Sequence, residues 1–240
     1  MAIRRRILRA SALLFAFGAG ACASSQVAPA GSAGPPAEAA PQAQAPVQPA
    51  AAAGTPSTTL PTPESYLGFK VGADRHLADW NTVLGYLTEL AQASPRVKMD
   101  TLGETTLGRP FVMLTISSEA NMRRLEHYRQ INRTLADPRQ IASPAEAERL
   151  IHEGKAIVLI TASIHSTEVG GTQMTMRLAH ELASAPTAAD REILDNVILL
   201  LVPSLNPDGE DMVTHWYDGT LGKPWEGTSP PFLYHYYTGH

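Results

Sequence analysis

A histidine and a glutamate three residues apart follow an apolar run in the segment IVLITASIHSTEVGG. These residues are His165 and Glu168. Imidazole and carboxylate groups are common ligands of Zn²⁺, and catalytic zinc usually takes three protein ligands and a water molecule. His165 and Glu168 would supply two of those three ligands. Their types and spacing therefore predict a zinc site whose third ligand lies elsewhere.

A His-x-x-Glu pattern is weak when it stands alone, because similar pairs arise by chance. The chain also contains His76 with Asp79, and His215 with Asp218. His76 is expected where a helix begins and His215 in a loop. In contrast, His165 leaves the end of a buried strand, where a polar side chain needs a partner. This location favours the pair that begins at His165.

Two continuous apolar runs, at residues 156–162 and 196–203, are typical of strands buried on both faces of a largely parallel sheet. Between them Met174, Leu178 and Leu182 recur every four residues, which predicts a helix with these side chains in the core. Strand, helix and strand would form a right-handed crossover. Open α/β sheets bind ligands at the carboxyl ends of their strands, so the polar segments after both runs should face one crevice.

Four further elements are expected before the first apolar run. Apolar residues recur at helical spacing from residue 77 to 91, after a candidate cap at Asp74, and predict a helix. Residues 97–117 predict a hairpin with a turn at Gly103 to Pro110. A polar helix is expected near residues 120–135, and a capped helix from Ser143 to Gly154.

The N-terminus has the pattern of an export signal. A positive end, MAIRRRILR, precedes the short apolar stretch ALLFAFGAG and small residues, so residues 1–23 are predicted to be a signal peptide. This stretch is too short for a stable membrane span. Cys22 is the only cysteine, which excludes an intramolecular disulfide. The sequence GAGAC favours a lipoprotein signal lipidated at Cys22, although ordinary cleavage also fits. We therefore expect an exported protein, either a periplasmic or outer-membrane lipoprotein or a secreted one.

The rest of the chain divides into a linker and one domain. Residues 24–63 are rich in Ala, Pro and Gln, nearly without charged or large apolar side chains, and are predicted to be a disordered linker. Residues 64–240 are long enough for a single domain. The net charge of -4 offers no basic excess for binding nucleic acid, which excludes it as an expected partner.

These motifs together resemble the zinc carboxypeptidase family of the carboxypeptidase A-like type. The family's metal pair is similar to His165 and Glu168, its Asn-Pro-Asp-Gly signature to residues 206–209, and its early Gly-Arg-Pro hairpin to residues 108–110. The resemblance implies a three-layer α/β/α fold with a mixed, largely parallel central sheet. It also implies one catalytic Zn²⁺ and removal of residues from the C-terminal end of peptides. Within this pattern, Arg109 and the Asn-Pro-Asp-Gly segment are expected to be scaffold.

The chain departs from the family after residue 209. The family's Asn-Arg pair, third metal histidine and catalytic glutamate normally follow there, but Arg191 is the last arginine. Glu226, expected in a loop, gives no reason to be the catalytic base. His235 and His240 lie too near residue 209 to match the third histidine. We therefore identify no catalytic residue and expect that the C-terminal part of the domain is missing.

Three functions are compatible with these residues. The first is an exported zinc metallopeptidase that acts on peptides or cell-wall stem peptides, present as an incomplete catalytic domain. The second is a zinc-dependent amidase or deacylase of related fold. The third is a non-catalytic envelope lipoprotein that binds peptide or glycan.

Overall fold

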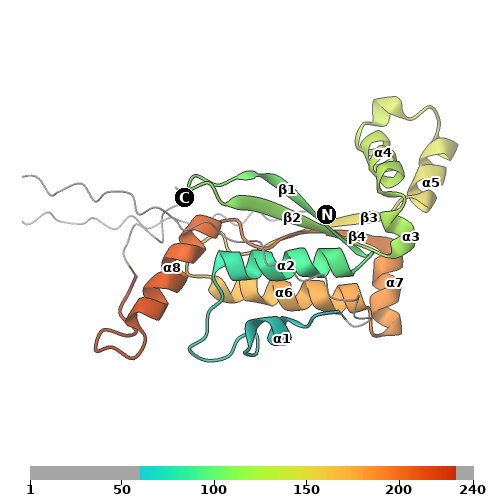
Figure 1. Ribbon diagram of the computed structural model, residues 1–240. Coiled ribbons are helices and arrows are strands. Elements are labelled where there is room, and N and C mark those ends of the chain that lie inside the picture. The colour runs from blue at the N-terminus through green and yellow to red at the C-terminus, as the bar shows by residue number, and fades with distance from the viewer. Residues whose placement is uncertain (1–59, 231–240) are drawn as a thin grey trace, which may run out of the picture. The chain divides into compact units, whose positions relative to one another are not determined.

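A computed structural model describes residues 60–230 of the chain (Figure 1). In chain order the elements are α1 (Pro63–Leu67), α2 (Trp80–Ala93), β1 (Val97–Glu104), β2 (Pro110–Ile116), α3 (Glu119–Met122), α4 (Leu125–Ala136), the 3₁₀ helix η1 (Pro138–Gln140), α5 (Pro144–Glu153), β3 (Ala156–Thr161), α6 (Val169–Ser184), α7 (Ala188–Asn196), β4 (Val197–Val202) and α8 (Pro207–Thr220). Within the described range, no helix combines the length and hydrophobicity that crossing a bilayer requires.

The strands form one sheet in the order β1-β2-β4-β3. β1 and β2 are the predicted hairpin, with an irregularity in the pairing between Thr101 and Gly103. β2 pairs with β4 in antiparallel fashion, whereas β3 and β4 run parallel. The mixed sheet of an α/β fold is thus confirmed. Among the described residues, parallel pairing is confined to the two strands that carry the candidate motifs.

Helices α2 and α6 cover one face of the sheet (Figure 1). The buried side chains Trp80, Leu87 and Leu90 of α2 pack in the same core as Leu114 of β2 and Leu201 of β4. Because this apolar core faces the sheet, α2 is held against the strands that lead to the candidate site.

The first residue of α2 differs from the prediction. Asp79, not Asp74, is the N-cap, and its carboxylate accepts a hydrogen bond from the backbone N–H of Thr82 at 2.8 Å. The apolar periodicity had included Leu77, which lies before the helix. An N-cap side chain accepts from the N–H two or three residues further on, and the bond from Thr82 to Asp79 places the helix start at Trp80.

A smaller cluster lies on part of the other face of the sheet. Tyr128 and Ile131 of α4 and Leu150 of α5 pack with Ile198 of β4, so helices lie on both faces as in the predicted three-layer arrangement. The polar helix expected near residues 120–135 is divided into α3 and α4. Ser143 and Gly154 bound α5 as predicted.

The prediction that both apolar runs are buried is correct for β4 and wrong for β3. Leu159 is 61% exposed, and Ile157 and Val158 are also exposed. In the described sheet β3 is an edge strand paired only with β4, so its outer side has no neighbouring strand. An apolar run indicates that a strand can be buried, but it does not show how many other strands pair with it.

The crossover between β3 and β4 contains two helices, α6 and α7, where the sequence predicted one. Met174 was expected in the core and is 44% exposed, whereas Met176 is fully buried. The inward face of α6 instead includes small and polar side chains, among them Thr172 and Gln173. Leu182 is buried and Leu178 packs against the core as predicted, so the expected packing is wrong only for Met174.

Candidate metal site and its scaffold

The loops that follow β3 and β4 are joined through their backbones. The N–H of Ala162 donates to the carbonyl of Val202 at 3.1 Å, and the N–H of Leu205 donates to the carbonyl of Ala162 at 2.8 Å. These bonds continue the parallel ladder beyond the strand ends. The two polar segments therefore lie side by side, as the parallel strands predicted.

His165 and Glu168 converge in the first of these loops. Nδ1 of His165 lies 2.9 Å from Oε1 of Glu168, and the backbone N–H of His165 donates to Oε2 at 3.0 Å. Both side chains reach solvent, with exposed fractions of 38% and 47%. The hydrogen bond with the imidazole, followed by that with the backbone, lowers the pKa of the Glu168 carboxyl.

This donor pair fits two positions in the ligand set of a zinc ion. An imidazole nitrogen and an ionised carboxylate face each other, and both are accessible from outside. Within residues 60–230, no group of three or more His, Cys, Asp or Glu side chains is arranged to hold a metal. The structure thus brings the two predicted ligands together, and the zinc site itself remains a prediction.

Ser163 shapes the loop between β3 and the metal pair. It is one of the non-glycine residues with positive φ, at 52°, a region that costs energy for a residue with a side chain. Its hydroxyl donates to the carbonyl of Glu168 at 2.7 Å. A Cβ at Gly171 would lie 2.9 Å from this hydroxyl, so glycine leaves room for it. At the neighbouring Gly170, a Cβ would meet nothing within 4 Å, so close packing requires glycine only at position 171.

The Asn-Pro-Asp-Gly segment begins a helix. Asn206 is the N-cap of α8, and its side-chain oxygen accepts from the N–H of Gly209 at 3.0 Å. A Cβ at Gly209 would come within 2.8 Å of Cβ of Ser166. The start of α8 therefore packs directly on the loop that carries His165. The sequence contains the signals of this helix, an asparagine cap and a proline at the first position, but the segment was expected only to be scaffold.

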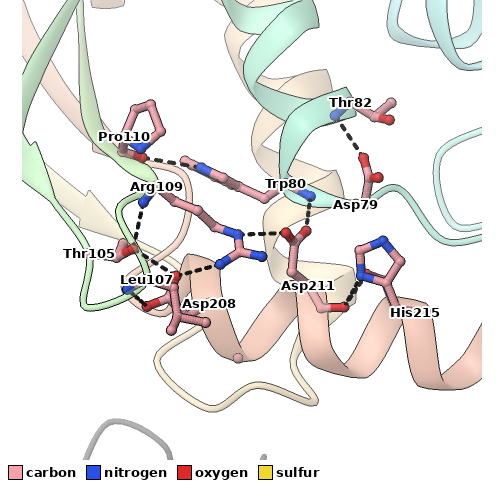
Figure 2. A network of polar contacts seen from close by, with 12 residues as sticks. Asp79, Trp80, Thr82, Thr105, Leu107, Arg109, Pro110, Asp208, Asp211 and His215 are labelled. Atoms are coloured by element: carbon pink, nitrogen blue, oxygen red, sulfur yellow. Dashed lines mark hydrogen bonds and ion pairs between the residues drawn. The ribbon is translucent and has the colours of Figure 1, made fainter. Parts of the chain in front are cut away.

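Arg109 joins the β1–β2 hairpin to α8 (Figure 2). Its Nε donates to Oδ2 of Asp211 at 2.6 Å, and a terminal nitrogen donates to Oδ1 of Asp208 at 3.0 Å. Both carboxylates are almost completely buried, so the guanidinium compensates two charges removed from water. These contacts give Arg109 the structural role that the sequence predicted.

The same two carboxylates accept further hydrogen bonds (Figure 2). The hydroxyl of Thr105 and the N–H of Leu107 donate to Asp208 at 2.7 and 3.1 Å, and the N–H of Trp80 donates to Asp211 at 2.8 Å. Three segments distant in sequence thus meet at the first turn of α8. Sequence reasoning missed Asp211, although its spacing of three from Asp208 places both on one side of a helix.

Glu210, between α8 and α6, is a second residue that sequence reasoning did not single out. Its side chain is 1% exposed. Burial raises its pKa to about 8; hydrogen bonds with Thr172 and Ser204 lower it, and the charges of Asp211 and Asp79 raise it further. An acidic residue in the first turn of a helix is usually solvated, so the sequence contains no signal of this burial.

The alternative pairs found in the sequence have other structural roles. The ring of His76 stacks on Phe69 with centroids 4.9 Å apart, and Asp79 caps α2. His215, expected in a loop, lies within α8, where Nδ1 contacts the carbonyl of Asp211 at 2.7 Å. The loop expectation was wrong because the helix that begins at Pro207 had not been recognised.

Of the remaining candidate residues, one forms an ion pair with another element and three lie in the ends of the chain that the structure does not describe. Glu226 forms an ion pair with Arg75 at 2.6 Å, away from the metal pair. Cys22, His235 and His240 lie outside the described residues.

The arrangement defines an α/β domain in which a convergent histidine and glutamate stand at the carboxyl end of a strand, beside a helix start fixed by buried ion pairs. The sequence profile of the zinc carboxypeptidase family matches residues 83–225, which contain the hairpin, the metal pair and α8. The chain therefore belongs to this family. No curated protein matches it.

Solved structures with similarity to this chain include several carboxypeptidases. Carboxypeptidase A from Helicoverpa armigera is 20% identical with a TM-score of 0.41, over 67% of this chain and 32% of that one. A metallo-carboxypeptidase from Burkholderia cenocepacia is 25% identical with a TM-score of 0.33, over 52% of this chain and 26% of that one. Bovine thrombin-activatable fibrinolysis inhibitor is 13% identical with a TM-score of 0.40, over 58% of this chain and 34% of that one. The chain thus spans about a third or less of the length of these proteins.

Proposed function

We propose that this chain is part of an exported zinc metallopeptidase that removes C-terminal residues from peptides, including peptides of the cell wall. The observation that carries the proposal is the 2.9 Å approach of His165 Nδ1 and Glu168 Oε1 at the end of β3. Membership of the zinc carboxypeptidase family supports the same chemistry.

In this proposal His165 and Glu168 hold the zinc ion together with a third ligand. Bound zinc lowers the pKa of its water molecule and polarises a peptide carbonyl. A carboxylate binds metal only when it is deprotonated. The hydrogen bonds that lower the pKa of Glu168 therefore keep it ready to bind at neutral pH. The buried scaffold beneath fixes both loops, so the two side chains are oriented before substrate binds.

Metal binding by the purified 240-residue chain tests the proposal. Zinc affinity would be measured by competition with a chromophoric chelator for the wild type, His165→Ala and Glu168→Ala. Each substitution removes a ligand and should weaken binding by about tenfold or more. His152→Ala is the matched control, because His152 is an exposed histidine near the end of α5. Equal affinities for the wild type and both site variants would refute the metal assignment.

The reaction is tested with the protein in its native host, where any continuation of the chain is present. Purified native protein should release single amino acids from the C-terminus of model peptides, and His165→Ala should abolish the release. Release of an acyl group instead would establish an amidase or deacylase. Zinc binding without any hydrolysis would indicate a binding protein.

Export is proposed from residues 1–23, with lipidation at Cys22. Acyl chains would hold the protein at an envelope membrane. Fractionation of cells should place the wild type with membranes, and Cys22→Ser should move it to the soluble periplasmic or secreted fraction. Cytoplasmic retention of the wild type would contradict the proposal.

A further inference from the structure

A line of polar groups connects the interior of the domain to the candidate metal loop, which is the segment 162–168 between β3 and α6. Oε2 of Glu210 lies 3.0 Å from Oγ1 of Thr172, which lies 2.8 Å from Oγ of Ser163. The Ser163 hydroxyl lies 2.7 Å from the carbonyl oxygen of Glu168. Thr172 and Glu210 are buried between α6 and α8, and the line ends at the backbone of a proposed zinc ligand.

The directions of these hydrogen bonds follow from the available protons. The carbonyl of Glu168 can only accept, so the single hydroxyl proton of Ser163 is used there. The contact between Ser163 and Thr172 then requires that Thr172 donates its own proton. Both contacts of Thr172 Oγ1 suit donation by its hydroxyl, which has a single proton. With that proton directed to Ser163, the 3.0 Å contact with Glu210 needs a proton from the other side. That proton must come from Glu210.

The surroundings of Glu210 also favour its neutral form. Hydrogen bonds with Thr172 and Ser204 lower the pKa of the carboxyl group, but among the described residues no group hydrogen bonds its buried Oε1. A carboxylate oxygen in that position would lose hydration without compensation. Asp211 on α8 and Asp79 at the start of α2 both face it with negative charge, and burial raises its pKa most strongly. The guanidinium of Arg109 is bound to Asp208 and Asp211, on either side of Glu210 in the sequence.

We propose that Glu210 is a neutral carboxylic acid in the folded protein, and that it positions the candidate metal loop by donating to Thr172, which donates to Ser163. Glu210 is a positioning residue in this arrangement, because it acts through two hydroxyl groups and does not touch the metal pair. The role in metal binding rests on the proposed function, whereas the protonation of Glu210 does not.

The chain of hydrogen bonds accounts for the strained conformation of Ser163. A residue with positive φ persists when its surroundings fix it in more than one way. Here Ser163 both donates to Glu168 and accepts from Thr172. With Glu210 ionised, Thr172 would turn its proton toward the carboxylate, and Ser163 would lose the bond that it accepts.

Infrared spectroscopy tests the protonation directly. The carbonyl stretch of a protonated carboxylic acid is separated from the bands of a carboxylate. At neutral pH, the wild type minus Glu210→Gln difference spectrum should contain this acid band. The wild type minus Glu192→Gln spectrum is the control and should lack it, because Glu192 is exposed on α7. A carboxylate band in place of the acid band for Glu210 would overturn the proposal.

Zinc affinity then tests the positioning role. Glu210→Gln retains a neutral side chain with a donor, so its affinity should stay close to that of the wild type. Glu210→Leu removes the donor and should weaken binding by about tenfold or more. Circular dichroism establishes that both variants are folded. Equal affinity of folded Glu210→Leu and the wild type would refute the positioning role. If His165→Ala also left affinity unchanged, the proposed metal site would fail, while the infrared result would still decide the state of Glu210.

Discussion

Nδ1 of His165 lies 2.9 Å from Oε1 of Glu168, and the backbone of the same histidine donates to the other carboxylate oxygen. One residue therefore binds both oxygens of the other from a distance of three positions in sequence. The pair is a compact local unit whose geometry is set by the loop between β3 and α6.

The first prediction concerns the titration of Glu168. Because hydrogen bonds from His165 favour the ionised form, the carboxyl pKa of Glu168 should lie below its ordinary value. This stabilising contribution is present above the unfolded pKa and is lost as pH falls through the folded pKa. Carbon-13 NMR of the side-chain carboxyl measures the midpoint, and His165→Ala should raise it. An unchanged midpoint in that variant would contradict the assigned cause.

The second prediction concerns Arg109. Arg109→Met leaves the buried carboxylates of Asp208 and Asp211 without their cation, and should lower the free energy of unfolding by about 3 kcal/mol or more. Urea denaturation followed by tryptophan fluorescence measures the change. Arg129→Met is the control, since Arg129 pairs with Glu126 at the surface, and should leave the free energy of unfolding nearly unchanged. Similar losses in both variants would show that burial of the carboxylates is not the cause.

The third prediction compares two glycines of α8. Gly209→Ala places a methyl group against the side chain of Asn206 and 2.8 Å from Cβ of Ser166, and should destabilise the protein by about 1–3 kcal/mol through overpacking. A Cβ at Gly219 meets nothing within 4 Å, so Gly219→Ala should be neutral or stabilising by up to about 1 kcal/mol. Thermal unfolding of the two variants distinguishes them. A stable Gly209→Ala would show that the loop and the helix are not in close contact.

The fourth prediction is a pH dependence caused by Glu210. Its folded pKa of about 8 lies above the ordinary value of 4.5, so the folded state retains a proton that the unfolded state releases between these values. Stability contributed by this proton is complete below the unfolded pKa and is lost as pH rises through the folded pKa, at about 1.4 kcal/mol per pH unit.

Urea denaturation at several pH values between 5 and 8 checks this slope. Glu210→Gln binds no proton at this position, so its stability relative to the wild type should increase across the range. A constant difference between the two proteins would mean that Glu210 titrates at the same pH in the folded and unfolded states.

The sequence predicted those features that depend on local pattern. The hairpin followed from alternating residues around Gly103 to Pro110, and α5 from its cap at Ser143. The proximity of His165 and Glu168 followed from their spacing after a strand. In each case the determining contacts lie within a few residues, so a single stretch of sequence contains the necessary signals.

The features that the sequence did not predict depend on residues far apart. The buried Glu210 of α8 contacts Thr172 of α6, and the exposed Leu159 belongs to β3 at the edge of the described sheet. The role of Asp211 requires both Arg109 and Trp80. None of these relationships leaves a periodic pattern, because the partners are about 100 residues or more distant or belong to different elements.

The separation between Arg109 and its partners also bears on how the domain forms. Asp208 and Asp211 are 99 and 102 positions further along the chain. Closing so long a loop costs entropy before the ion pairs can compensate it, and contacts of high sequence separation slow folding. During synthesis the hairpin is complete long before either aspartate has been translated. The contacts of Arg109 with the start of α8 can therefore form only at a late stage, after α6 and β4 are available to bring α8 into place.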